Sequence, residues 1–344
     1  MKNLKVKSIL FSLLAIFATS IFMTSCDQEE LQIGNSLESS VTSLKNIRVE
    51  NQNGILKFEG GEDFFAEFEL LNNATTEELI AFTDDLGFES YLSAVNDAYA
   101  ELETISSADE MEVFENTYNH LFTFENDQIA EKIENLAYAA ITNIDGLVLI
   151  GNYAMKVEND RVIEELTGDL EALRNLNPLS NLDELPNTNV VYSRAVPTGC
   201  PNSSTAWTET SSRKLDFSIT VYPVSCGCCG QYRAFYRVKA KGYKKSWGKW
   251  KSYKTYLEFE CVDFTVKVNG TSYSVSGVSK NQDNVKEMTR TGWIGPIVLD
   301  YPSFQLYKVR GRGSSRGVGT KWAVICCNYG TSCPSNTGYA GNCP

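Results

Sequence analysis

Tyr232-Arg-Ala-Phe-Tyr-Arg-Val-Lys-Ala-Lys241 is the stretch that decides the fold of the second half of this chain. Its side chains alternate with a period of two. One face carries Tyr232, Ala234, Tyr236, Val238 and Ala240. The other carries Arg233, Phe235, Arg237, Lys239 and Lys241. This alternation predicts a β-strand that places its less polar face in a core.

More strands flank this one in the sequence. Residues 217–221 alternate in the same way, and residues 264–268 run into Asn269-Gly270, the strongest short turn signal for a hairpin. Two further strands, around 304–309 and 322–327, bracket a loop rich in arginine and glycine that begins at Arg310. A run of strands separated by turns predicts an antiparallel, sandwich-like β domain.

The preceding half has a different period. Thr75 and Glu78 fit a capping box ahead of a helix that ends at Gly87, and Ser107 and Glu110 fit a second box. We expect helices over 75–86, 88–105, 107–121 and 129–140, with hairpins over 47–58 and 146–157. The predicted fold class is therefore α+β: an acidic, mainly helical N-terminal domain with a small β hairpin region, followed by a cysteine-rich, antiparallel, β-sandwich-like C-terminal domain.

The two halves of the chain differ in charge as clearly as they differ in the spacing of their hydrophobic residues. The formal net charge of the whole chain is −12. Residues 27–192 hold 7 lysines and arginines against 35 acidic residues, whereas residues 193–344 hold 21 against 8. Such an asymmetry indicates two modules with different surfaces.

The N-terminus carries export signals. Lys2, Lys5 and Lys7 precede an apolar run over 9–23 that is too short to span a bilayer comfortably, and the small residue Ser25 stands before Cys26. This arrangement resembles the signal of bacterial lipoproteins, in which the cysteine thiol becomes lipidated. An acidic run directly follows Cys26, and it resembles the export signal of surface lipoproteins of the Bacteroidota.

These signals and the composition shifts divide the chain into five segments. We expect a lipoprotein signal peptide at 1–25, an acidic flexible tether at 26–44, an acidic α-rich domain at 45–177, a linker at 178–199 and a basic, cysteine-rich β domain at 200–344. The resemblance implies an outer-membrane location facing the cell exterior and a palmitate-type lipid anchor on Cys26.

Cysteine is confined to the β half, apart from Cys26. The nine downstream cysteines are Cys200, Cys226, Cys228, Cys229, Cys261, Cys326, Cys327, Cys333 and Cys343. Disulfides persist outside the cytosol, so we expect these cysteines to form disulfides. Two from each dense cluster, Cys226-Gly-Cys228-Cys229 and Cys326-Cys327, could instead bind zinc, but Cys226 and Cys228 are spaced C-x-C and the remaining neighbours are adjacent, unlike a usual zinc knuckle. We therefore predict no metal and no cofactor.

No catalytic residue can be nominated from the sequence. His120 is the only histidine, and no serine or cysteine nucleophile stands near it in the sequence, so we expect it on the surface. Acidic residues are too abundant for a glycosidase pair to be singled out. Gly-rich phosphate loops are absent as well.

A basic-aromatic stretch is the most suggestive feature. It interleaves rings and cations, and the Arg-rich loop adds three guanidinium groups; the candidate polyanion-binding residues are Lys244, Lys245, Trp247, Lys249, Trp250, Lys251, Tyr253, Lys254, Arg310, Arg312 and Arg316. Rings stack on sugars or bases, and cations hold phosphates, sulfates or carboxylates. Two structural alternatives stay open: the tryptophans belong to the core beside a lysine-rich edge strand, or the basic domain docks on the acidic one.

The segment Trp247-Gly-Lys-Trp250-Lys-Ser-Tyr253-Lys-Thr255 and the paired acidic and β-rich modules are similar to the uncharacterised two-domain surface lipoproteins of the Bacteroidota. This resemblance implies location and architecture only. We expect a binding or interaction role toward an anionic glycan, an envelope polymer or a host surface, and no specific nucleic acid. A surface hydrolase of polysaccharide or peptide and a structural envelope protein are the alternatives.

Overall fold

The computed structural model describes residues 44–125, 127–158, 161–176, 186–192, 203–227, 230–299, 304–316 and 319–326. All of them belong to one compact unit, Ser39–Pro344. Cys26, the signal peptide and most of the predicted tether and linker lie outside the described residues. The part of the predicted linker that is described contains a strand, β8 (Thr188–Tyr192).

The helices precede most of the strands. They are η1 (Leu44–Asn46), α3 (Glu62–Asn73), α4 (Thr76–Asp85), α5 (Tyr91–Thr104), α6 (Ala108–Thr117), α7 (Leu136–Ile141) and α8 (Leu170–Arg174). The predicted capping box at Thr75 and Glu78 is confirmed, because each side chain bonds the backbone N–H of the other residue. In the part of the chain that the structure describes, no helix is long and apolar enough to cross a membrane.

The first sheet belongs to the acidic half. It has six strands in the order β1-β2-β5-β6-β7-β8. The strands before β8 are β1 (Val49–Asn51), β2 (Leu56–Phe58), β5 (Leu147–Ile150), β6 (Tyr153–Val157) and β7 (Arg161–Glu165). β1 and β2 are turned by Asn53-Gly54, and β5 and β6 by Gly151-Asn152, so both predicted hairpins are present.

The second sheet joins the two halves of the chain. Its main path is β3-β4-β12-β11-β10-β9, and β15 also pairs with β11. Two strands come from the acidic half, β3 (Phe122–Glu125) and β4 (Gln128–Glu131). The others are β9 (Ser203–Glu209), β10 (Arg213–Ser225), β11 (Gln231–Ser246), β12 (Lys249–Ser252) and β15 (Glu287–Leu299).

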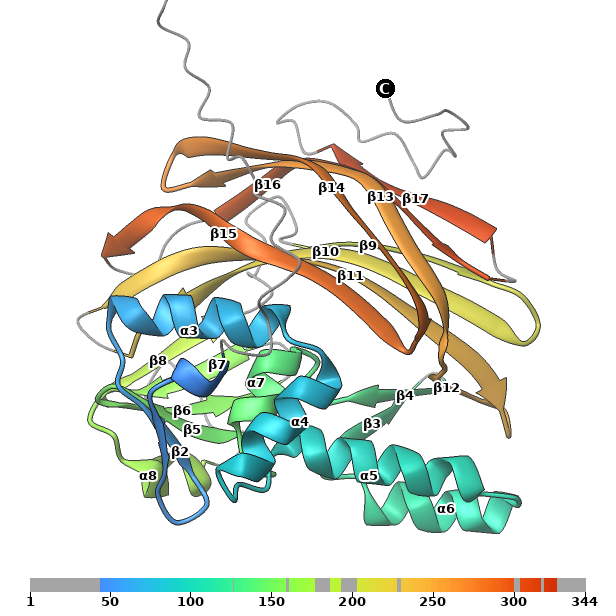
Figure 1. The fold of residues 1–344 in the computed structure, drawn as a ribbon, viewed down its shortest axis with the longest axis horizontal. Coiled ribbons are helices and arrows are strands. Elements are labelled where there is room, and N and C mark those ends of the chain that lie inside the picture. Colours follow the sequence, from blue (N-terminus) through green and yellow to red (C-terminus); the bar gives the residue numbers. More distant parts are fainter. Residues whose placement is uncertain are drawn as a thin grey trace, which may run out of the picture. The chain divides into compact units, whose positions relative to one another are not determined.

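The third sheet covers the second. It consists of β14 (Thr271–Val285), β13 (Thr255–Val268), β16 (Phe304–Ser315) and β17 (Gly319–Cys326), in that order. Figure 1 shows it as a layer over β9, β10 and β11, with α3 on the far side of those strands. The even-numbered face of β11 packs into the core between the layers, where Tyr236 meets Phe264 with ring centroids 5.2 Å apart.

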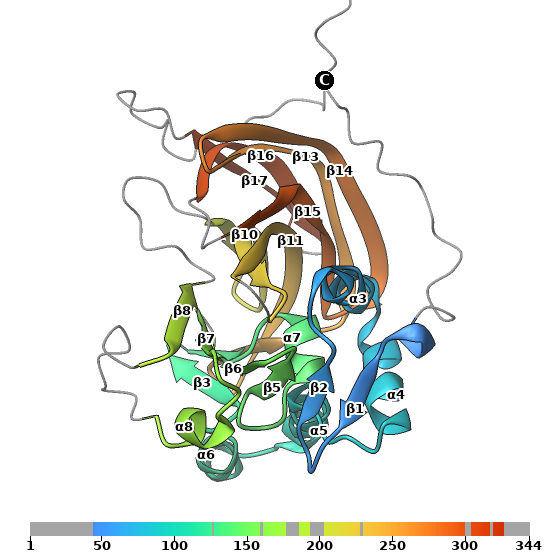
Figure 2. The same cartoon turned by 90° about the vertical axis from the view of Figure 1, so that its left-hand side faces the viewer.

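A second core lies on the other face of β11. Phe235 packs there against Phe68 of α3, with centroids 5.5 Å apart, and against Trp293 of β15. Figure 2 shows α3 beside the β-rich layers from a second direction. Because this core takes residues from both halves of the chain, the acidic and basic segments share apolar packing as well as a sheet.

The predicted fold class is wrong for the N-terminal half. The described helices are short, and the same region contributes strands β1 to β8, so more of the described residues lie in strands than in helices. The clearest error is the helix expected over 129–140. Its first part is β4, paired with β3, and only Leu136–Ile141 is helical. A strand of four residues is too short for its alternation to be recognised, and the spacing of its apolar residues also fits a helix.

Two further boundaries also differ from the expectation. α6 ends at Thr117 rather than continuing to residue 121, so His120 lies in the turn that leads to β3. In the C-terminal half, the arginine- and glycine-rich stretch from Arg310 to Ser315 is not a loop but the second part of β16. Its glycines fit there because Gly311 and Gly313 face Phe217 closely, and an added Cβ would lie about 3 Å from that ring.

Candidate functional site

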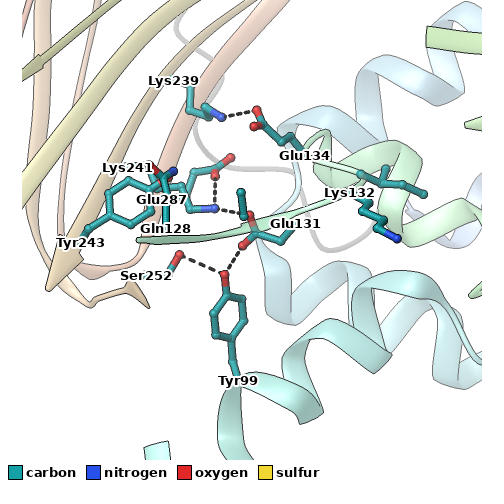
Figure 3. A network of polar contacts seen from close by, with 12 residues as sticks. Tyr99, Gln128, Glu131, Lys132, Glu134, Lys239, Lys241, Tyr243, Ser252 and Glu287 are labelled. Carbon is teal, nitrogen blue, oxygen red and sulfur yellow. Dashed lines mark hydrogen bonds and ion pairs between the residues drawn. The ribbon is translucent and has the colours of Figure 1, made fainter. Parts of the chain in front are cut away.

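A buried ion-pair network joins β11 to the acidic half (Figure 3). The Lys241 ammonium lies 2.5 Å from a Glu131 carboxylate oxygen and 3.7 Å from Glu287. Lys239 lies 2.7 Å from Glu134, and Arg237 lies 3.7 Å from the same carboxylate. All three cations belong to the odd-numbered face of β11, so the alternation of that strand delivers them to one surface.

The acidic partners come from a short connection. Glu131 ends β4, and Glu134 lies just before α7, whose N-cap is Asn135. Tyr99 of α5 adds a hydroxyl that donates to Glu131 at 2.5 Å and lies 3.4 Å from the Ser252 hydroxyl. Every side chain in this set therefore has at least one polar partner, while two buried atoms of the wider network, Arg237 Nε and one Glu287 carboxylate oxygen, have no hydrogen-bond partner among the described residues.

The network keeps its groups charged. The positive charge of Lys239 holds the pKa of Glu134 far below its usual range, against the effect of burial. Burial alone raises the pKa of Glu131, but the charge and hydrogen bond of Lys241 outweigh it and lower that pKa. Burial alone lowers the pKa of Lys241, but Glu131, Glu287 and the neighbouring tyrosines together outweigh it and raise that pKa. Glu131, Glu134 and Lys241 are thus held in their charged forms, which suits a role in holding the two segments together rather than acid–base chemistry.

A basic site lies at the end of the same sheet where β10 begins and β11 and β12 end; Lys244 is exposed there, and Arg213 and Lys251 are half-buried. Arg213 pairs with Lys244 in the β10–β11 register, and Lys244 pairs with Lys251 in the β11–β12 register. We call these three residues the cation row. Directly opposed like charges in a sheet destabilise one another. Within the described residues, neither Arg213 nor Lys244 forms an ion pair with a carboxylate.

Tyr253 forms the floor of this site. The Arg213 guanidinium lies 4.0 Å from its ring centroid, and the Lys244 ammonium lies 5.6 Å from it. The hydrogen bond and charge of Arg213 lower the pKa of the Tyr253 hydroxyl. Lys251 reaches the Leu102 carbonyl at 3.4 Å, and its pKa is lowered by burial; the charge of Glu103 opposes this shift and that of Lys244 adds to it. The local field is therefore positive enough to favour an added anion.

The structure divides the predicted basic-aromatic stretch. Trp250 is buried at 8% exposure, whereas Trp247 is 55% exposed at the tip of the β11–β12 hairpin. Lys249 lies 3.3 Å from Glu115 of α6, and Lys245 lies over the Trp250 ring at 5.4 Å. Lys254 is exposed. The stretch thus contributes one core tryptophan, one exposed tryptophan and an ion-paired lysine as well as two members of the cation row.

The three predicted arginines lie on β16, in a different sheet, or just beyond it. Arg312 forms an ion pair with Glu260 of β13, and Arg316 lies 3.5 Å from Asp283 of β14. The side chain of Arg310 lies outside the described part of the structure. The predicted Arg-rich loop is a strand, and two of its arginines already have carboxylate partners.

Only two of the nine predicted disulfide cysteines have described side chains. Cys226 is buried, with its sulfur 3.6 Å from the Gln231 side-chain oxygen. Cys261 is disulfide-bonded. The other cysteines' side chains lie outside the description, so the pairing stays a prediction. No group of three metal-binding side chains is found in the described part of the chain. His120 is exposed, and its ring stacks near Tyr118 with centroids 6.4 Å apart.

Arg213 was missed by the sequence analysis. It lies on the same face as Leu215 and Phe217, two positions before the first apolar residue of that alternation. Extending the period-two pattern backwards would have placed it on β10. Its pairing with Lys244 could not be read in that way, because the register depends on the β10–β11 hairpin as a whole.

No family model matches the chain, and no curated protein matches it. Among solved structures, the chain is similar to a DUF4848 family protein from Bacteroides thetaiotaomicron. The likeness covers 81% of this chain and 99% of that one, with 15% sequence identity and a TM-score of 0.29. A TM-score this low transfers neither fold nor function.

Proposed function

We propose that this chain is a lipid-anchored outer-membrane protein, facing the cell exterior, that binds anionic polymers through the cation row. The observation that carries the proposal is the register: Arg213, Lys244 and Lys251 are neighbours across three strands at one end of the sheet, where Lys244 is exposed and the other two are half-buried. Three adjacent cations repel one another, and a chain of phosphates, sulfates or carboxylates would relieve that repulsion. The signal-like N-terminus and Cys26 support the location.

The buried network supports the division of roles. Arg237, Lys239 and Lys241 are neutralised by glutamates of the acidic half, so those cations of β11 are unavailable to a ligand. Lys244 lies on the same strand beyond the contact with Glu131 and is exposed. One strand thus uses its buried cations for cohesion and its terminal cation for binding. Glu131 and Glu134, both ion-paired, favour a structural role over hydrolysis.

Binding of a fluorescent heparin oligosaccharide to the mature chain tests the proposal. Arg213→Gln, Lys244→Gln and Lys251→Gln together should weaken binding at least about tenfold, since each contact to a polyanion releases counterions. The control removes the same charge elsewhere: Lys45→Gln, Lys57→Gln and Lys132→Gln. Equal affinities of the two triple variants would refute the assignment of the site, and no binding by the parent protein would refute the function.

A further inference from the structure

Three hairpins of this fold share one turn geometry. Each has a two-residue loop closed by a strand pair: Asn53-Gly54, Trp247-Gly248 and Asn269-Gly270. The first loop residue has a φ of 55° in Asn53, 52° in Trp247 and 46° in Asn269, and each following glycine is also at positive φ. Positive φ at both positions is the signature of the type I′ hairpin turn.

Tryptophan is out of place in that turn. The left-handed region is disfavoured for residues with a bulky side chain, and asparagine is preferred there because its short polar side chain bonds locally. The other two turns follow that preference. Packing does not explain the exception, because the Trp247 side chain is 55% exposed. Residues held in sparsely populated backbone conformations cluster at binding sites.

Trp247 lies in the turn at the end of the hairpin that carries two members of the cation row, Lys244 and Lys251. It follows Lys244 by three residues and comes directly after the last residue of β11, Ser246, so its backbone lies within about 10 Å of that of Lys244. Lys245 and Lys249 flank the loop on its two strands. The other rings of the stretch are occupied, since Trp250 is buried and Tyr253 is covered by Arg213. The site therefore offers one free indole face next to several cations.

We infer that Trp247 stacks on a sugar ring of an anionic polysaccharide whose acidic groups bind the cation row. This inference rests on the proposed function and names its ligand class. An indole face buries the apolar C–H face of a sugar, a contact that a bare polyphosphate cannot supply. Single-stranded nucleic acids also stack, but their binding channels present several exposed rings in succession. A lone exposed ring beside cations fits an acidic glycan better.

Trp247→Asn is the decisive variant, because asparagine occupies the equivalent position of the two other turns. The substitution should leave the turn intact, so the urea midpoint should stay equal or rise. We expect affinity for a heparin oligosaccharide to fall about tenfold, as for loss of one stacked ring. Affinity for polyphosphate of matched charge should stay within about twofold, because its contacts are purely ionic. A double variant, Trp247→Asn with Asn269→Trp, moves the indole to another hairpin and should not restore heparin binding.

The possible outcomes distinguish a failure of the stacking inference from a failure of the proposed polyanion binding. If the parent protein binds neither heparin nor polyphosphate, both are wrong. If it binds both, and Trp247→Asn weakens neither or weakens both equally, the stacking inference is wrong while polyanion binding stands. A loss confined to oligo(dT), or to vesicles of anionic lipid, would assign the indole to a nucleic acid or to a membrane surface and would likewise overturn the glycan.

Discussion

The Lys241 ammonium and the Glu131 carboxylate are 2.5 Å apart, with side-chain exposures of 5% and 13%. They lie 110 residues apart in the sequence, one in the basic half of the chain and one in the acidic half. The opposite charges of the two halves therefore meet in at least one desolvated contact. The ion pair connects the charge partition of the sequence to the packing of the fold.

Removing one side of that contact should be costly. Lys241→Met leaves Glu131 and Glu287 buried without their cation, and we expect the free energy of unfolding to fall by about 3–5 kcal/mol. Adding Glu131→Gln should recover part of the loss, because one uncompensated charge is then removed. Urea unfolding measures both, provided that the denaturant slope is unchanged.

An exposed pair provides the matched control. Arg174 and Glu171 form an ion pair on the surface of α8. Arg174→Met should cost less than about 1 kcal/mol, because solvent screens such pairs. If Lys241→Met costs no more than this control, the network does not hold the two segments together.

Glu164 should make stability depend on pH. It is buried on β7, accepts a hydrogen bond from the Tyr232 hydroxyl at 2.9 Å, and has Ser225 and Asn189 as further polar neighbours. Burial raises its pKa from the usual 4.5 to about 7. The folded state then binds the proton more tightly than the unfolded state, so the stabilisation is complete below about pH 4.5 and is lost as the pH rises through 7.

The size of the effect follows from that shift. Between pH 5 and pH 8 the free energy of unfolding should fall by about 2–3 kcal/mol, at about 1.4 kcal/mol per pH unit. Glu164→Gln should abolish this component, whereas Glu112→Gln on the exposed face of α6 should leave it. If the free energy of unfolding depends on pH in the same way in the parent protein and in Glu164→Gln, Glu164 does not titrate in this range.

Much of the local structure could be predicted, because its signals are local. Thr75 with Glu78 marked the start of a helix, and Asn53-Gly54 and Asn269-Gly270 marked hairpins. The wrong predictions concern segments whose secondary structure depends on pairing with residues far away in the sequence. β4 is a strand because it pairs with β3 and makes a parallel contact with β12. The sequence of its four residues does not reveal these two pairings.

The candidate site divides in the same way. Alternation on β11 put Lys239, Lys241 and their neighbours on one face, but it could not say whether that face meets water or glutamates. Likewise, Trp247 and Trp250 are three residues apart, and only the position of the turn makes one exposed and the other buried. Arg213 belongs to the site because the β10–β11 register pairs it with Lys244, and that register cannot be read from the sequence.

The lipid anchor is testable by itself. Cys26→Ser should abolish incorporation of a fatty-acid probe during growth, because the proposal makes that thiol the acyl acceptor. Cys261→Ser keeps Cys26 and should be labelled as strongly as the parent protein. Labelling of the Cys26 variant at the parental level would end the lipoprotein assignment.

The dependence of heparin affinity on salt tests polyanion binding most directly. For contacts to about three cations, the slope of log affinity against log salt concentration should be about −2 to −3. Replacing Arg213, Lys244 and Lys251 by glutamine should flatten that slope, and the triple variant of Lys45, Lys57 and Lys132 should retain it. A parental slope near zero, or the same slope in both triple variants, would contradict binding at the cation row.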